Sequence, residues 1–233
     1  MNKKIVVTGA TKGIGRAIAE KFAANGFDVA VCARSEKDLK ALQSKLQTAN
    51  NKIIAQKCDV SKKDDIKAFS DTILREFGTV DVLVNNAGIY LPGQVYNETE
   101  GTLETLIETN LYSAYHLSRA LLPSMVKRKS GHIFNLCSVA SIQAYPDGGS
   151  YSISKFALLG MSKALREELK QFHVKVTALL PGATHTASWE GTHHPDSRFM
   201  KAADIAQIVW DIYNLSANTV VEEVVLRPIL GDL

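Results

Sequence analysis

The sequence alternates short, nearly all-apolar segments with longer segments whose apolar residues recur at helical spacing. Residues 4–8 are mainly β-branched, and residues 14–27 place Ile14, Ala17, Ile18 and Phe22 on one helical face. Short apolar strands separated by helices indicate a parallel sheet with both faces covered. Strands are expected at residues 4–8, 28–33, 52–58, 80–85, 132–137, 174–180 and 223–227, and helices at 14–27, 36–46, 61–77, 102–127, 151–172 and 203–213. We therefore predict an α/β, Rossmann-type doubly wound sheet of about seven parallel strands.

The chain is long enough for one globular domain, with 233 residues of which 45% are apolar and 22% charged. Because no repeat, low-complexity stretch or linker divides it, residues 1–233 are expected to form a single domain. Residues 182–202 lack periodicity, and so long a loop in a compact domain usually has a function, here expected to be substrate binding. The small net charge of +3 is spread along the chain, which argues against a nucleic-acid or membrane surface.

The cysteines, Cys32, Cys58 and Cys137, lie in or beside strand-like segments and lack the paired spacing of metal ligands. This pattern favours buried, reduced thiols in a reducing compartment, with Cys137 in the core rather than acting as a nucleophile. The first residues contain no charged leader with an apolar core, and no apolar run approaches the ~18 residues of a membrane span. We expect a cytoplasmic enzyme.

Tyr151 and Lys155 are one helical turn apart, so both side chains should face the same way. A nearby lysine cation is expected to lower the pKa of the tyrosine, which makes the phenol a usable proton donor and acceptor. Ser138 follows an apolar run and should emerge at the carboxyl end of a strand, where sheets of this kind bind ligands. Taken alone, the Tyr151–Lys155 pair is equally compatible with an ordinary amphipathic helix surface.

A glycine-rich turn, Thr8-Gly9-Ala10-Thr11-Lys12-Gly13-Ile14-Gly15, joins the first strand to the first helix. Glycines there allow a tight turn and close approach of the backbone to a pyrophosphate at the helix N-terminus. The order and spacing of these motifs match the short-chain dehydrogenase/reductase family: the T-G-x-x-x-G-x-G turn, Asn85-Asn86-Ala87-Gly88, Asn110, Ser138, Tyr151, Lys155 and Pro181-Gly182. The chain resembles that family over nearly its whole length.

The resemblance implies catalytic roles for four residues. Tyr151 would be the general acid in carbonyl reduction, and Ser138 would hydrogen-bond the substrate oxygen. Lys155 would also hold the nicotinamide ribose, and Asn110 would keep a water in the proton relay. Asn110 could in addition distort its helix, since the two roles can coexist.

The resemblance also implies a cofactor site. Asp59 would accept from the adenine amino group, or could simply be a turn residue, and Asn86 would line the adenosine ribose. The expected cofactor-binding residues are Thr8, Gly9, Thr11, Lys12, Gly13, Ile14, Gly15, Arg34, Asp59, Val60, Asn86, Ala87, Gly88, Tyr151, Lys155, Pro181, Gly182, Thr184 and Thr186.

Charge at the end of the second strand predicts NADP(H) as the cofactor. Sites that select NAD place a carboxylate there, but this chain has Ala33, so no acid would repel a 2′-phosphate. Arg34 follows, and Lys12 in the glycine turn adds a second cation. The alternative is that Arg34 is a solvated loop residue.

Three functional hypotheses differ in class. An NADPH-dependent carbonyl reductase is favoured over a cofactor-bound sensor without chemistry, because all four catalytic residues are present. A metal site formed by His185, His193, His194 and Asp196 has little support from the sequence, so no metal is expected.

Two substrate classes compete: small carbonyl compounds and 3-oxoacyl chains on an acidic carrier protein. A carrier would need basic residues around the pocket mouth, which 127–129 could supply, but Phe172 stands where carrier-dependent enzymes usually have a second basic residue. The C-terminal residues resemble those of bacterial sepiapterin-reductase-like proteins, and Trp189 offers a flat face for a ring, unless it is a loop anchor. We expect a small ketone or vicinal dicarbonyl, bound near Ser138, Tyr145 and Trp189. By resemblance, a homodimer or homotetramer is expected, paired through the helices at 102–127 and 151–172.

Overall fold

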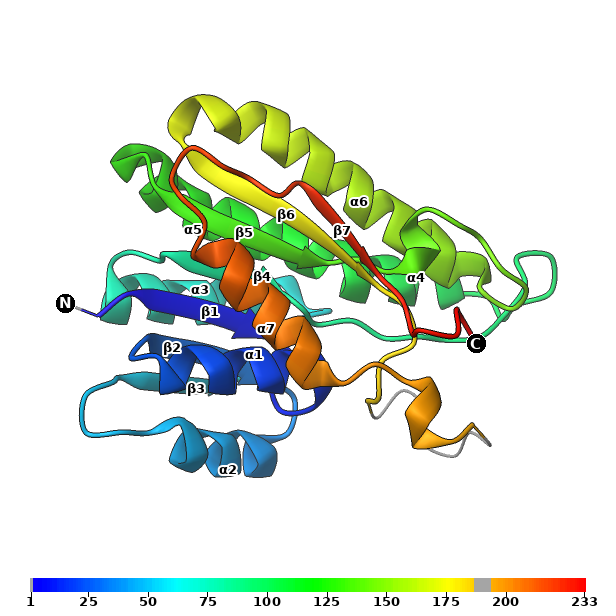
Figure 1. The fold of residues 1–233 in the computed structure, drawn as a ribbon, viewed down its shortest axis with the longest axis horizontal. Coiled ribbons are helices and arrows are strands. Elements are labelled where there is room, and N and C mark those ends of the chain that lie inside the picture. Colours follow the sequence, from blue (N-terminus) through cyan, green and yellow to red (C-terminus); the bar gives the residue numbers. More distant parts are fainter. Residues whose placement is uncertain (1, 187–193) are drawn as a thin grey trace.

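Seven parallel strands form one sheet in the order β3-β2-β1-β4-β5-β6-β7 (Figure 1). The computed structural model describes residues 2–186 and 194–233. The strands are β1 Lys4–Thr8, β2 Asp28–Ala33, β3 Ile53–Lys57, β4 Val82–Asn85, β5 Gly131–Leu136, β6 Val174–Pro181 and β7 Glu223–Leu226. The α-helices are α1 Gly13–Ala24, α2 Glu36–Leu46, α3 Lys63–Phe77, α4 Thr102–Ile107, α5 Ser113–Arg128, α6 Gly149–Leu169 and α7 Ala202–Tyr213. The predicted doubly wound α/β fold in a single domain is confirmed.

Helices cover both faces of the sheet. Successive residues of a strand point to opposite faces, so the apolar residues of each strand are buried on both sides. In β1, Ile5 and Val7 pack into one core with α1, α2 and α7, whereas Val6 packs into the other with α3 and α5. Burial on both faces is the reason that these strands are almost wholly apolar. Cys32, Cys58 and Cys137 are buried and unpaired. No helix among residues 2–186 and 194–233 is long and apolar enough to cross a membrane.

Two predicted helices differ from the observed helical segments by more than two residues or by a break. The helix predicted over residues 14–27 ends at Ala24, because Gly26 turns the chain with a φ of 81°. The helix predicted over residues 102–127 is divided into α4, a π-helical turn over Glu108–Tyr112 and α5. Asn110 lies inside this π-helical turn, so the helix is distorted at the residue for which the sequence suggested it.

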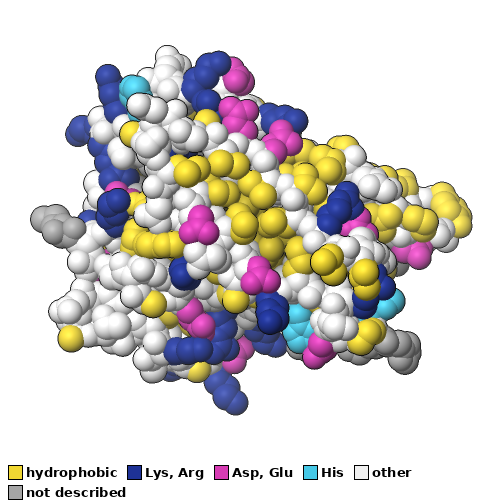
Figure 2. Space-filling view, in the orientation of Figure 1, with side chains coloured by type: hydrophobic (Ala, Val, Ile, Leu, Met, Phe, Trp, Pro, Cys, Tyr) yellow, Lys and Arg dark blue, Asp and Glu magenta, His cyan; other side chains and the backbone are white. Residues whose placement is uncertain are grey.

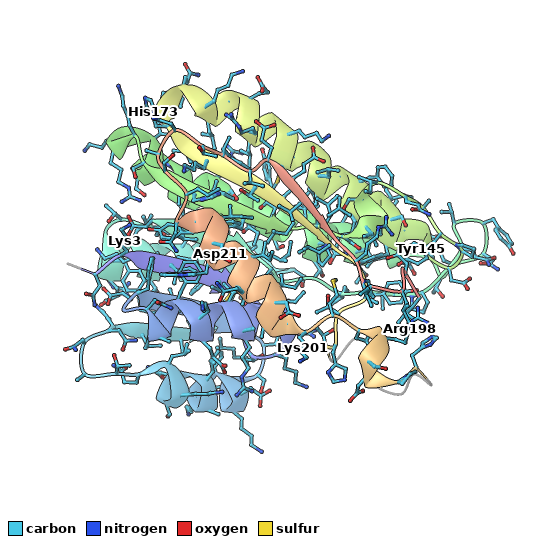
Figure 3. The ribbon with its side chains drawn as sticks, in the orientation of Figure 1. Lys3, Tyr145, His173, Arg198, Lys201 and Asp211 are labelled. Atoms are coloured by element: carbon cyan, nitrogen blue, oxygen red, sulfur yellow. The ribbon has the colours of Figure 1, made fainter. Side chains whose placement is uncertain are left out.

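The carboxyl ends of the strands share one edge of the sheet, and the loops that follow them meet there. In Figure 3, Tyr145 and Arg198 lie at this edge, while Lys3 and His173 lie at the opposite edge, where β1 and β6 begin. Parallel open sheets bind their ligands at the carboxyl edge.

Candidate active site

A cleft of about 1240 Å³ runs along the carboxyl edge of the sheet. Its volume exceeds that of ordinary small-molecule pockets, which enclose ~300–1,000 Å³. The cleft brings together nearly all the predicted site residues that are described. Those that line it are Gly9, Thr11, Lys12, Gly13, Ile14, Arg34, Asp59, Val60, Asn86, Ala87, Gly88, Ser138, Tyr145, Tyr151, Lys155, Pro181, Gly182, Thr184 and Thr186. Thr8, Gly15 and Asn110 are not among its lining residues and support it from behind.

The glycine-rich turn is tied to the loop after β4. Asn86 Nδ2 donates to the carbonyl oxygens of Thr8 at 2.8 Å and Gly9 at 3.1 Å, and the backbone amides of Asn86 and Ala87 donate to Thr8 Oγ1. A Cβ atom at Gly15 would lie 2.3 Å from Asn86 Nδ2. Glycine is therefore required at position 15 for this close approach.

The start of α1 is shaped to receive an anion. Lys12 precedes the first helical residue and its side chain does not cap the helix, so the first amide groups are open to a ligand. Gly13 has a φ of 55°, and a Cβ atom there would lie 2.9 Å from Thr186 Cγ2. The turn and the loop after β6 thus approach each other closely, leaving backbone donors and a cation beside the cleft. This cradle fits a pyrophosphate.

Asp59 lines the cleft and forms the turn that the sequence suggested as its alternative role, while its contact with adenine stays a prediction. Its Oδ1 accepts hydrogen bonds from Ser61 N at 3.1 Å and Ser61 Oγ at 2.8 Å, as a turn residue would. Burial alone would raise the pKa of Asp59, but the bonds from Ser61 and the charge of Arg34 lower it overall. The adjoining helix starts later than predicted, at Lys63.

Tyr151 and Ser138 lie close together in the cleft. Ser138 starts a 3₁₀ turn over Val139–Ser141, where its Oγ accepts from Ala140 N at 3.1 Å. Burial raises the pKa of Tyr151, and a hydrogen bond with Ser138 offsets part of that rise. The predicted lowering of the tyrosine pKa is therefore wrong for the protein alone, because burial of the phenol outweighs the other effects.

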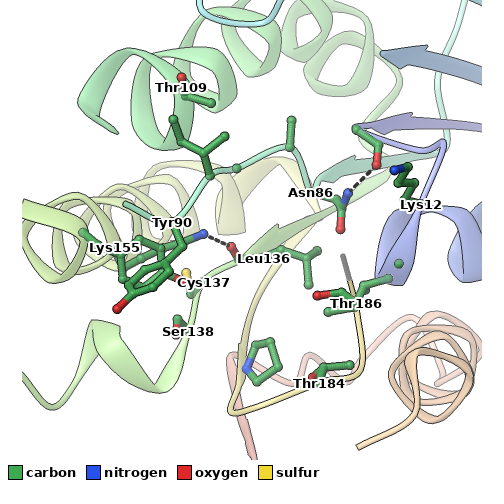
Figure 4. Close-up of a pocket in the computed structure, with 18 of the residues that line it drawn as sticks. Lys12, Asn86, Tyr90, Thr109, Leu136, Cys137, Ser138, Lys155, Thr184 and Thr186 are labelled. Carbon is green, nitrogen blue, oxygen red and sulfur yellow. Dashed lines mark hydrogen bonds between the residues drawn. The ribbon is translucent and has the colours of Figure 1, made fainter. Parts of the chain in front are cut away.

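Lys155 is buried beneath the cleft, with its Nζ donating to Leu136 O at 2.8 Å (Figure 4). Its Nζ lies 5.8 Å from the centre of the Tyr151 ring. Burial lowers the pKa of Lys155 to about 8. The hydrogen bond to Leu136 O holds the side chain close to Tyr151. Because the pKa is lowered, the ammonium group loses its proton at a lower pH than an ordinary lysine.

Asn110 joins the loop after β4 to α6. Its Oδ1 accepts from Ile89 N at 2.8 Å, and its Nδ2 donates to Ile89 O and to Ser154 Oγ, both at 3.0 Å. Ser154 Oγ in turn donates to Tyr151 O at 2.7 Å. Asn110 thus ties the loop after β4 to the first turns of α6, while the water predicted beside it remains a prediction.

Tyr90 is a site residue that the sequence did not reveal. Its ring meets the Tyr151 ring edge to face, with centroids 5.0 Å apart, and burial raises its pKa. Tyr90 and Tyr145 are both about two-fifths exposed, at 38% and 39%, so their rings are accessible from the cleft. Burial also raises the pKa of Tyr145 and raises that of Cys137 to about 11, which keeps this thiol neutral as predicted.

Two predictions concern the loop at residues 182–202. Trp189 and His193 lie outside the described residues. His185 Nε2 and Asp196 Oδ1 are 3.3 Å apart, but no group of three metal-binding side chains occurs among residues 2–186 and 194–233.

Comparison with known proteins agrees with this geometry. A family model described as short chain dehydrogenase matches residues 3–196. The sepiapterin reductase of Chlorobaculum tepidum is 32% identical over 241 residues, covering 100% of this chain and 99% of its own, and a 3-oxoacyl-[acyl-carrier-protein] reductase of Chlamydia muridarum is 34% identical over 192 residues, covering 82% and 77%. An alcohol dehydrogenase of the archaeon Thermococcus sibiricus, complexed with 5-hydroxy-NADP, has a TM-score of 0.92 at 30% identity and covers 100% of this chain and 99% of its own. Several structural neighbours are complexed with NADP or NADPH.

Proposed function

The chain belongs to the short-chain dehydrogenase/reductase family, and we propose that it reduces a carbonyl group of a small molecule to an alcohol with NADPH. The observation that carries this proposal is the meeting of Tyr151, Ser138 and Lys155 in a cleft whose other end is a glycine-rich anion cradle. A non-catalytic sensor would need the cradle but not the phenol beside a hydroxyl.

The catalytic residues divide the work of carbonyl reduction. NADPH, when bound, would supply the hydride. The Ser138 hydroxyl can donate to the substrate oxygen, and the Tyr151 phenol, hydrogen-bonded to Ser138, can then give it a proton. Lys155 can release its bond to Leu136 O and hold a ribose hydroxyl and the forming phenolate. Burial of Tyr151 keeps the phenol protonated until a substrate is in place.

The residues around the cleft fit NADP(H). The cradle at Gly9, Gly13 and Lys12 would hold the pyrophosphate, and Asp59 and Val60 would border the adenine. Arg34 lines the cleft beside Ala33 and forms no hydrogen bond or ion pair with another residue of the described ranges, which leaves its guanidinium free for a 2′-phosphate. Asp38 also lines this end of the cleft, and its backbone amide donates to the Ser35 hydroxyl.

The basic residues considered for a carrier-linked substrate lie away from the cleft within this chain. Lys127, Arg128 and Lys129 lie where β5 begins, at the edge of the sheet opposite the cleft, and Arg128 pairs with Asp81 at 2.8 Å. Phe172 likewise precedes β6 at that edge. Since these residues do not line the cleft of their own chain, the basic cluster considered in the sequence offers no support within one subunit for a carrier protein.

The rings of Tyr90 and Tyr145 favour a small ketone or vicinal dicarbonyl, cyclic or aromatic, over an acyl chain. NADPH oxidation should be measured with sepiapterin and small diketones and with acetoacetyl thioesters, at one NADPH concentration. We expect the diketones or sepiapterin to give the higher kcat/KM. A clearly higher kcat/KM for a carrier-linked thioester would reverse this preference, and no NADPH oxidation with any of the carbonyls would favour the sensor.

Assembly into a homodimer or homotetramer is part of the proposal. Hydrophobic side chains remain exposed on the long helices α5 and α6, and Figure 2 shows hydrophobic side chains gathered over α6 and the neighbouring β7. Tyr115 on α5 and Phe156 on α6 are 40% and 47% exposed. We expect light scattering to give a dimer or tetramer, and Phe156→Glu to dissociate it. A monomeric wild-type protein at micromolar concentration would contradict this expectation.

A further inference from the structure

Residues 89–98, here called the strap, run from the loop after β4 to the N-terminus of the catalytic helix α6. The strap is fixed at its beginning by Asn110, which binds both the amide and the carbonyl of Ile89. Farther along, the phenol of Tyr90 donates to Asp147 O at 3.3 Å, and its ring packs on Tyr151. The strap therefore touches the catalytic tyrosine directly.

The middle of the strap docks backbone to backbone on the segment that leads into α6. Gly93 N donates to Asp147 O at 3.0 Å, and Gly149 N donates to Gly93 O at 3.0 Å. Gln94 Nε2 adds a bond to Asp147 Oδ1 at 2.9 Å. A Cβ atom at Gly149 would lie 2.7 Å from Gly93 O, so the two backbones are as close as glycine allows.

Glu98 ends the strap at the first turn of α6. This helix has Gly148 as its N-cap, no side-chain cap and no acidic residue in its first turn, so its leading amides need acceptors from elsewhere. Glu98 Oε2 accepts from Ser150 N at 3.4 Å, and Oε1 accepts from the buried Ser150 hydroxyl. A carboxylate at this end also complements the helix dipole.

We propose that Glu98 is a positioning residue of the reductase, which caps α6 from the strap and holds Tyr151 in reach of the substrate. Tyr151 directly follows Ser150, so a shift of the first turn would move the phenol away from Ser138. Glu98 does not line the cleft and acts only through Ser150 and the strap. Its loss should therefore reduce turnover and leave the cradle for the cofactor intact.

The test compares Glu98→Ala and Glu98→Gln with a matched control, Glu100→Ala, which removes an exposed carboxylate two residues away. Amide exchange is followed by mass spectrometry over residues 145–155, and kcat and the NADPH dissociation constant are measured separately. Because loss of the cap lets the first turn of α6 open more often, Glu98→Ala should speed exchange there by about fivefold or more. Its kcat should fall by about tenfold, with NADPH affinity within about twofold of wild type. Glu98→Gln keeps an acceptor oxygen and should retain kcat within about threefold, and the control should match wild type.

Unchanged exchange and unchanged kcat in Glu98→Ala would overturn the proposal. So would a glutamine variant as impaired as the alanine variant, or a loss of NADPH affinity parallel to the loss of kcat, since either would indicate general damage to the fold. The kinetic part rests on the proposed reductase activity. If the wild-type protein reduces no carbonyl, that function fails, and the exchange measurement alone still decides whether Glu98 caps α6.

Discussion

Replacing Tyr151 by phenylalanine should lower kcat by two orders of magnitude or more and leave NADPH binding nearly unchanged. Phenylalanine keeps the ring and its edge contact with Tyr90, but it removes the hydroxyl that bonds to Ser138 and would protonate the substrate. A positioned general acid contributes ~10²–10⁴-fold to rate. The measurement is steady-state kcat together with NADPH affinity from fluorescence titration. Near-normal turnover would remove Tyr151 from the catalytic role.

Lys155→Met provides the contrast, because the lysine is assigned two tasks. This variant should lose turnover and also bind NADPH more weakly. Burial lowers the pKa of Lys155 to about 8, so the protein alone holds the charge below that pH and loses it as the pH rises through that value. NADPH affinity of the wild type should therefore fall above about pH 8, and that of Lys155→Met should change less over the same range. Equal pH dependence in both proteins would show that Lys155 does not hold the cofactor by its charge.

The fold could be predicted from the sequence where an apolar pattern or a helix-capping residue marks an element in its own residues. The bounds of β2 and α2 agree with the predicted ones. The start of α2 is marked by Ser35, whose hydroxyl caps the helix by accepting from Asp38 N. The helix end at Ala24 was missed because the apolar pattern continues to Phe27 beyond the glycine turn. The π-helical turn at Asn110 was expected only as a distortion, because its geometry depends on contacts with Ile89 and Ser154.

The candidate site divides in the same way. Glycines and polar residues at strand ends could be found because their spacing along the chain is informative. Tyr90 and Glu98 could not, because their function depends on partners more than fifty positions away in a segment without periodicity. The pKa of Tyr151 was predicted in the wrong direction because the sequence shows which charges are nearby in the chain, but not how deeply the phenol is buried.

Cofactor preference offers the second large effect, and it depends on two neighbouring positions. Ala33 ends β2 and lines the cleft, and the exposed Arg34 follows it, in the same part of the cleft as Asp59. In the double variant Ala33→Asp with Arg34→Ile, a 2′-phosphate would lose a charge-assisted partner and meet a carboxylate. The same carboxylate could accept hydrogen bonds from the ribose hydroxyls of NAD, so the change acts on both cofactors in opposite directions.

Each charge-assisted contact contributes ~1.5–3 kcal/mol, and ~1.4 kcal/mol corresponds to tenfold. The ratio of kcat/KM with NADPH to kcat/KM with NADH should therefore fall by at least about tenfold in Ala33→Asp/Arg34→Ile. Lys37→Met is the matched control, because it removes an exposed cation of α2 that does not line the cleft, and it should leave the ratio unchanged. A wild-type protein that already prefers NADH would show that Arg34 is a solvated loop residue, and an equal fall in the control would show that the general positive charge of α2, rather than the Arg34 guanidinium, selects the phosphate.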